Sequence, residues 1–268
     1  MSSTNSRWVF LRGLTRESRH WGDFPAIFRG AIPGAETYAI DLPGNGCLND
    51  MESPCSVEQM AEHCRAELGR RGLAPPWHLL AMSLGAMVAV AWAARYPEEI
   101  DGCVLINTSL RPLNPFHRRL KPSNYPTLLG MALPGRTAAA QEESVLRLTS
   151  RRAEAAAHIL RAWTAYRTER PVSHRNALRQ LLAAARYSAP RRKPTTRLLL
   201  LASAGDALVD SRCTLEIARC WQSAVAVHPD AGHDLPLDDG PWVASQVRDW
   251  LRAEAGTAVL ADRALQRT

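Results

Sequence analysis

Three side chains of this sequence, Ser83, Asp206 and His233, could together carry out nucleophilic attack on a carbonyl group. A serine hydroxyl is a poor nucleophile at neutral pH. It needs a base within hydrogen-bond reach, and that base needs a carboxylate to orient it. The chain supplies the three groups in the order serine, aspartate, histidine. This set predicts acyl transfer through a covalent acyl-enzyme intermediate, for which no metal ion and no organic cofactor is needed.

Each of these residues lies just past an apolar run that is expected to form a buried strand. Strand and helix patterns alternate along the chain, which is typical of a parallel sheet with right-handed crossovers. The carboxyl ends of parallel strands meet at one edge of the sheet, so we expect the three side chains to converge there. The expected strands are 7–11, 37–40, 77–81, 102–107, 197–202 and 224–228.

The segment around Ser83 is the centre of this arrangement. It has the form of a short strand, a tight turn and a buried helix, with the serine at the tip of the turn. Backbone crowds backbone at such a turn, and the small flanking residues Ala81 and Gly85 relieve that crowding. The apolar run after Ser83 is shorter than the roughly 20 residues of a bilayer span, so we expect a core helix. Residues 81–85 alone fit a serine that caps a core helix equally well.

The alternation of strands and helices stops after residue 110. From 111 to about 190 there is no convincing strand, and one helical stripe is expected to run continuously from near Thr137 to Pro171. About 80 helical residues are too many for a crossover connection. We therefore expect an inserted all-helical cap, residues 111–190, on an α/β core formed by residues 1–110 and 191–268.

The composition fits one large α/β domain with an insertion. The chain has 268 residues, of which 46% are hydrophobic, and a formal net charge of +7. Basic residues crowd between Arg111 and Lys193, which would attract an acidic partner or an anionic substrate, although a solvated basic face is the simpler interpretation. The polar start and the lack of a membrane span predict a cytoplasmic protein. No nucleic-acid-binding motif is present, so nucleic acid is not expected as a partner.

The stretch Ala81-Met82-Ser83-Leu84-Gly85 resembles the nucleophile elbow of the α/β-hydrolase fold superfamily. The sequence departs from the family pattern at Ala81, where glycine is most frequent, and at Arg12, where histidine is usual. Among capped serine hydrolases it is similar to small carboxylesterases such as the pimeloyl carrier-protein methyl ester esterase. The resemblance implies a mostly parallel, doubly wound sheet with an inserted all-helical cap.

The resemblance also implies roles for the three residues. Ser83 would be the nucleophile, His233 the base and Asp206 the acid, because Asp206 directly follows a glycine at a strand end, as the family's acid does. Asp210, one short turn later, is the alternative acid. His228, which ends a strand, is the alternative base.

Two further sets of residues follow from the resemblance. The backbone N–H groups of Leu14 and Leu84 would form the oxyanion hole. Met82, Trp163 and Tyr166 would face the substrate pocket. For the two aromatic residues, a place in the core of the cap is the alternative.

The function expected from these features is hydrolysis of a small-molecule carboxylic ester, and the basic cap would suit docking of an acidic acyl carrier protein. Two alternatives remain open at this stage. One is a non-hydrolytic enzyme of the same fold, such as an acyltransferase, or a carbon–carbon bond hydrolase. The other is a binding protein that has lost turnover.

Overall fold

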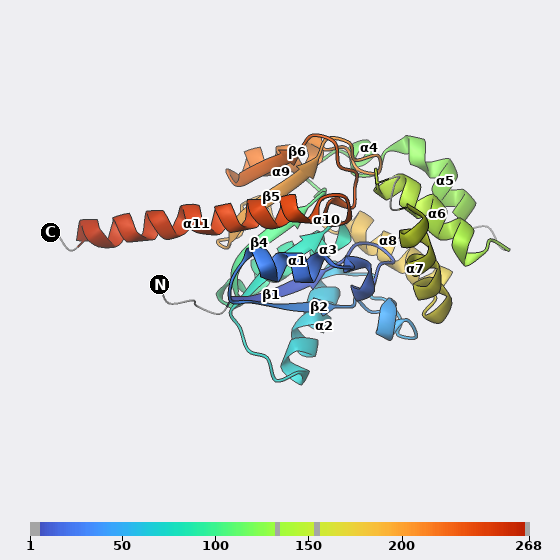
Figure 1. Ribbon diagram of the computed structural model, residues 1–268, viewed down its shortest axis with the longest axis horizontal. Helices are drawn as coiled ribbons and strands as arrows, with labels where there is room; N and C mark the ends of the chain where they lie inside the picture. The colour runs from blue at the N-terminus through green and yellow to red at the C-terminus, as the bar shows by residue number, and fades with distance from the viewer. Residues whose placement is uncertain (1–5, 132–134, 153–155, 266–268) are drawn as a thin grey trace.

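Six parallel strands form one sheet at the centre of the protein (Figure 1). The computed structural model describes residues 6–131, 135–152 and 156–265. The strand order across the sheet is β2-β1-β3-β4-β5-β6, and every neighbouring pair is parallel. The expected α/β class is therefore confirmed. The strands are β1 (Ser6–Leu11), β2 (Ala35–Ile40), β3 (Trp77–Met82), β4 (Ile100–Ile106), β5 (Arg197–Ser203) and β6 (Ala224–His228).

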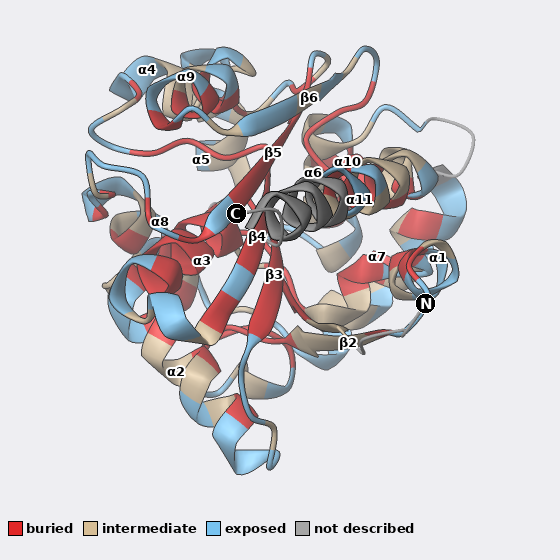
Figure 2. Cartoon of the chain, turned by 90° about the vertical axis from the view of Figure 1, so that its left-hand side faces the viewer, coloured by how far each residue is buried: buried red, intermediate tan, exposed pale blue. Residues whose placement is uncertain are grey.

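Helices cover both faces of this sheet. Successive side chains of a strand point to opposite faces, so Val9 and Leu11 of β1 join one core cluster while Trp8 and Phe10 join the other. Figure 2 shows the buried strands lying between the two helical layers. The sheet is thus doubly wound. One layer contains α2 (Val57–Arg70), α3 (Leu84–Arg95) and α9 (Arg212–Trp221), and the other contains α1 (Phe24–Ala31) and α11 (Gly240–Leu265).

The chain between β4 and β5 forms a group of helices at the end of the molecule toward which the strands run (Figure 1). These helices contact the loops that follow the strands. Gln180 in α8, for example, accepts a hydrogen bond of 2.9 Å from the N–H of Thr15. We call residues 111–190 the cap segment. Its helices are α4 (Phe116–Arg119), α5 (Tyr125–Met131), α6 (Ala138–Thr149), α7 (Ala156–Glu169) and α8 (His174–Arg186).

The prediction of one continuous helix through the middle of the cap segment is wrong. Helix α6 ends at Thr149, and Ser150 has an extended backbone with φ −125° and ψ 151°. The break is stabilised from outside the cap segment. The carbonyl of Thr149 accepts a 2.6 Å hydrogen bond from the N–H of Asp234, and Ser150 Oγ donates a 2.5 Å bond to Asp238. Apolar side chains of α6 and α7 pack into one small core, which explains why their stripe looks continuous in the sequence.

Short helical turns complete the fold. Within the described residues, no helix combines the length and the hydrophobicity that a membrane crossing would need. The short elements are η1 (Ser18–Trp21), η2 (Gly46–Leu48), η3 (Pro97–Glu99), η4 (Pro122–Asn124) and α10 (Leu235–Asp238).

Candidate active site

Ser83 forms the tight turn between β3 and α3 in a strained backbone conformation. Its φ is 54° and its ψ −118°, a combination that residues with a side chain rarely adopt. Its N–H donates to the carbonyl of Ile106 at 3.0 Å, and its carbonyl accepts from Thr108 Oγ1 at 3.1 Å. Strain of this kind persists only where the surroundings fix it, and it is frequent at functional sites. The turn holds Ser83 at the carboxyl edge of the sheet.

Two glycines let the backbone approach Ser83 closely. A Cβ atom on Gly85 would lie 2.5 Å from the carbonyl oxygens of Leu11 and Arg12 at the end of β1. A Cβ atom on Gly13 would lie 3.1 Å from Ser83 Cβ and 3.5 Å from Ser83 Oγ. The loop after β1 therefore passes directly against the serine, because neither glycine has a side chain to keep it away.

Two backbone N–H groups near Ser83 are available to a ligand. Leu84 is the first residue of α3, so its N–H has no acceptor within the helix and lies at the positive end of the helix dipole. Leu14 directly follows Gly13, and no group among the described residues accepts a hydrogen bond from its N–H. The loop that carries Leu14 is fixed by a 3.2 Å hydrogen bond from Arg16 N–H to the Gly13 carbonyl. These are the two donors that the sequence predicts for an oxyanion hole.

Asp206 and His233 form a buried pair. His233 Nδ1 lies 2.7 Å from Asp206 Oδ2, and the two residues are 4% and 2% exposed. The other carboxylate oxygen of Asp206 accepts hydrogen bonds from the N–H groups of Leu208 and Val209, at 2.8 and 2.9 Å. The carboxylate is therefore held in place, and it fixes the imidazole with Nε2 as its free nitrogen.

Protonation of His233 is set by opposing effects. Burial lowers the pKa of His233, but the charge and the hydrogen bond of Asp206 raise it, and Asp234 raises it further while Arg12 lowers it. The net result is a pKa above the ordinary value of 6.5. An imidazolium formed at this position would be stabilised by Asp206, which is what a general base needs as it accepts a proton.

The alternative acid and base lie in other contacts. Asp210 pairs with Arg212, at 2.5 Å, and this pairing lowers the pKa of Asp210. His228 Nε2 lies 3.2 Å from Asp239, and its Nδ1 faces the backbone N–H groups of the loop before His233. The carboxylate partner of His233 is thus Asp206.

Ser83 and His233 share the sheet edge but are not hydrogen-bonded to each other. Among the described residues, no group forms a hydrogen bond with Ser83 Oγ. Hydrogen bonds between a nucleophile and its base are often long in an enzyme without substrate and shorten in the complex.

Asn107 is hydrogen-bonded to the loop that carries His233, a contact that the sequence did not reveal. It directly follows β4, which lies between the strands that lead to Ser83 and Asp206, and it has a φ of 45°. Its side-chain N–H donates to the His233 carbonyl at 2.8 Å and to Ser203 Oγ at 2.9 Å, while its side-chain oxygen accepts from Ser203 N–H at 2.8 Å. Its only signal in the sequence is a polar amide at the end of an apolar strand.

The aromatic residues expected in the pocket contact charged residues between the cap segment and the loop after β1. The guanidinium groups of Arg16 and Arg19 lie 4.2 Å and 4.3 Å from the ring centroids of Trp163 and Tyr166. The imidazole of His20 packs edge-to-face on both rings. Both aromatic residues therefore help to join the cap segment to the core.

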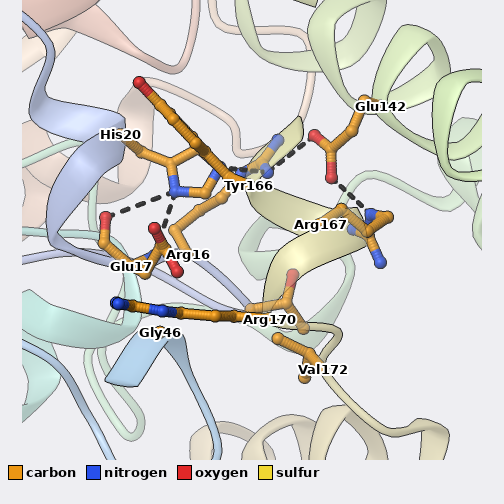
Figure 3. Close-up of a pocket in the computed structure, with 10 residues that line it drawn as sticks. Arg16, Glu17, His20, Gly46, Glu142, Tyr166, Arg167, Arg170 and Val172 are labelled. Carbon is orange, nitrogen blue, oxygen red and sulfur yellow. Dashed lines mark hydrogen bonds and ion pairs between the residues drawn. The ribbon is translucent and has the colours of Figure 1, made fainter. Parts of the chain in front are cut away.

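A buried carboxylate lies in the same region (Figure 3). Glu142 is 1% exposed, and it accepts hydrogen bonds from Arg16 and Arg167 at 2.7 and 2.5 Å. Burial, followed by the charges of Arg16 and Arg12, lowers the pKa of His20 well below 6.5. The imidazole of His20 is therefore neutral at pH 7. Its Nε2 lies 2.9 Å from Arg16 Nη1, and its Nδ1 lies 3.1 Å from the N–H of Glu17.

Met82, the third expected pocket residue, is 3% exposed and packs on the sheet face that α1 and α11 cover. One cavity lies beside Glu142 and another beside Trp92, and Ser83 lines neither of these two. The described residues also contain no group of three or more histidine, cysteine or acidic side chains that could hold a metal ion.

The sequence matches a model of the alpha/beta hydrolase family over residues 8–246. The chain belongs to this family. The parallel sheet described above is thus the sheet of an alpha/beta hydrolase.

Two curated relatives match this alpha/beta hydrolase over shorter stretches. The alpha/beta hydrolase domain-containing protein VTE7 of Arabidopsis thaliana is 42% identical over 76 residues, which are 28% of this chain and 22% of that protein. The biotin biosynthesis bifunctional protein BioHC of Teredinibacter turnerae is 30% identical over 102 residues, 38% of this chain and 17% of that protein. The chain therefore spans only about a fifth of the length of these relatives.

A solved structure resembles the whole fold. The esterase RhEst1 from Rhodococcus sp. ECU1013 aligns with a TM-score of 0.74 and 18% sequence identity, and the alignment covers 94% of this chain and 92% of that one. At this level of identity, the similarity applies to the fold.

Proposed function

We propose that this alpha/beta hydrolase cleaves a carboxylic ester by means of Ser83, His233 and Asp206. The observation that carries the proposal is the buried 2.7 Å contact between His233 Nδ1 and Asp206, at the same sheet edge as the strained Ser83. A strained serine alone would fit a structural turn, and a buried histidine alone would fit a core. Together they supply the nucleophile, the base and the orienting acid that acyl transfer needs.

The proposed reaction has two steps. His233 Nε2 accepts the proton of Ser83 Oγ as this oxygen attacks the ester carbonyl, and the N–H groups of Leu14 and Leu84 stabilise the oxyanion. The tetrahedral intermediate collapses, and His233 returns the proton to the departing alcohol. Water then attacks the acyl-enzyme, with His233 as base, and releases the acid and the free serine.

The charge of the cap segment supports an acidic partner. Residues 111–190 contain 14 arginine and lysine residues, 4 glutamates and no aspartate, although the whole chain has a net charge of only +7. A surface of this sign attracts anionic molecules at long range. We propose that the acyl group is presented on an acidic acyl carrier protein, which agrees with the biotin-biosynthesis name of one relative. If the basic residues only form a solvated surface, a free ester should be cleaved as well as an ester attached to a carrier protein.

The first experiment is labelling with a fluorophosphonate probe, measured by intact mass. The wild type should gain one adduct on Ser83, and Ser83→Ala and His233→Ala should gain none. Ser188→Ala, which changes an exposed serine of the cap segment, is the control and should label like the wild type. No adduct on the folded wild type would refute the proposed hydrolase.

Activity measurements then distinguish the substrate preference, hydrolysis from acyl transfer, and free from carrier-bound substrate. An ester series of increasing chain length, free and attached to a carrier protein, measures the substrate preference. A non-hydrolytic acyltransferase would instead pass the acyl group to an added alcohol or thiol faster than to water. Equal kcat/KM for free and carrier-bound esters at low salt would remove the carrier protein from the proposal.

A further inference from the structure

A buried ion pair joins the loop after β1 to the loop that carries His233. Arg12 donates two hydrogen bonds to Asp234, Nη1 to Oδ1 at 3.1 Å and Nη2 to Oδ2 at 2.5 Å. Both side chains are 3% exposed. Asp234 directly follows His233, and Arg12 lies two residues before Leu14, so the pair adjoins both sides of the proposed site.

The surroundings of Arg12 tie it to Ser83 as well. The backbone carbonyl of Arg12 lies against Gly85 in the first turn of α3, and the adjacent Gly13 lies against Ser83 itself. The guanidinium stacks on Trp21, 4.8 Å from the ring centroid. A planar group held on one face by an indole and at its tip by a carboxylate has little freedom to move.

This pair fixes geometry more than it adds stability. Two charges removed from water lose most of their mutual attraction to desolvation, so a buried pair is weak evidence for stability. Two parallel bonds between planar groups do, however, fix both a distance and an orientation. The elements oriented in this case are the donor loop of the oxyanion hole and the proposed base.

We infer that Arg12 and Asp234 are positioning residues, which set the place of His233 relative to Ser83 and the Leu14 N–H through their two-bond contact. The inference rests on the proposed acyl transfer. It gives a physical reason for an arginine where family members usually have histidine. It also predicts that the charges of Arg12 and Asp234 shift the pKa of His233 in opposite directions.

The electrostatic prediction supplies a readout that loss of packing alone would not give. Asp234 raises the pKa of His233 and Arg12 lowers it, while Asp206 has the largest raising effect. Asp234→Asn should therefore move the acid limb of the kcat/KM profile to lower pH. Arg12→Met should move the limb to higher pH, and Arg12→Lys, which keeps the charge, should leave it near the wild-type position.

The rate measurements test the two-bond geometry. Arg12→Lys keeps the charge but can no longer form the paired bonds, and we expect kcat to fall about 100-fold with a much smaller change in KM. Arg65→Lys is the matched control. Arg65 also makes two bonds to one carboxylate, 2.8 and 2.5 Å to Glu99, but this carboxylate precedes β4 at the amino end of the sheet. The Arg65→Lys variant should keep the wild-type kcat and the wild-type acid limb of the kcat/KM profile.

A folding check keeps the test decisive. Circular dichroism and thermal unfolding identify variants that do not fold, and for these the double variant Arg12→Met/Asp234→Leu, which buries no charge, takes their place. A folded variant of the pair with wild-type kcat and an unshifted acid limb would overturn the inference. Fluorophosphonate labelling of the wild type is read separately. A labelled wild type with unaffected variants refutes only the positioning role, whereas an unlabelled wild type refutes the proposed hydrolase and the inference with it.

Discussion

Replacement of Gly85 by alanine should disturb both stability and catalysis through one close contact. An added Cβ atom would lie 2.5 Å from the carbonyl oxygens of Leu11 and Arg12. The closest comfortable separation between such a carbon and a carbonyl oxygen is about 3.3 Å. Helix α3 and the end of β1 would have to separate by about 0.8 Å, because the atoms in the way belong to the backbone of a central strand.

The magnitude follows from what moves with α3. Overpacking of a well-packed core costs about 1–3 kcal/mol of stability. In a chain of this size, a cost of about 2 kcal/mol lowers Tm by about 4–8 °C. The shift also moves Ser83 and the Leu84 N–H relative to Gly13 and Leu14. A displacement of about 1 Å at a catalytic site reduces the rate about 100-fold. We therefore expect kcat/KM to fall by about that factor in protein that is still folded.

Gly69→Ala is the matched control for this change. Gly69 lies in α2, and, apart from its chain neighbours and the backbone of its own helix, no atom lies within 4 Å of the Cβ that alanine would add. Alanine should there raise the free energy of unfolding by about 0.4–1 kcal/mol. Thermal unfolding and ester hydrolysis of the two variants provide the assay. A Gly85→Ala protein with wild-type Tm and kcat/KM would refute the idea that the elbow needs glycine against β1.

Three further predictions test the site and its support. Asp206→Asn should lower kcat about 10⁴-fold, because the amide no longer orients and stabilises the imidazole. Asp210→Asn should keep a kcat close to wild type. Equal losses of kcat would contradict the pairing of His233 with Asp206. The kcat/KM profile should show an acid limb above pH 6.5, because His233 must be neutral to accept a proton and Asp206 raises its pKa; a limb below 6.5 would count against His233 as the base. Gln180→Ala should lower the free energy of unfolding, measured in urea, by about 1–3 kcal/mol, because it leaves the Thr15 N–H and Asn45 Oδ1 without their partner. An equal effect from Gln59→Ala, which changes an exposed residue, would show that the contacts of Gln180 are unimportant for stability.

The sequence predicted the sheet and the position of Ser83 well because both depend on local patterns. Apolar runs of strand length, separated by helices, leave few arrangements other than a parallel sheet, and the wholly buried β3 illustrates this. The strained turn at Ser83 follows from the small residues beside it. Both features can be recognised from local patterns, although distant residues hold them in place, as the hydrogen bond from Ser83 N–H to the Ile106 carbonyl does.

The supporting contacts were not predictable, because each joins residues far apart in sequence. Arg12 and Asp234 are 222 positions apart, and Asn107 and His233 are 126 apart. No periodicity encodes such a pair. The false prediction of one long helix has the same origin, because Ser150 leaves the helix to bind a carboxylate 88 positions away.

The break at Ser150 has a consequence for protein engineering. Asp238 accepts hydrogen bonds from Ser150 Oγ, from Arg151 N–H and from Gly232 N–H, at 2.5, 3.0 and 2.6 Å. One carboxylate thus ties the cap segment to the residue next to His233. A chimaera that replaces residues 111–190 with those of another family member would replace the segment that supplies two of these three donors. Such a graft should therefore include the loop 232–238 from the same donor protein.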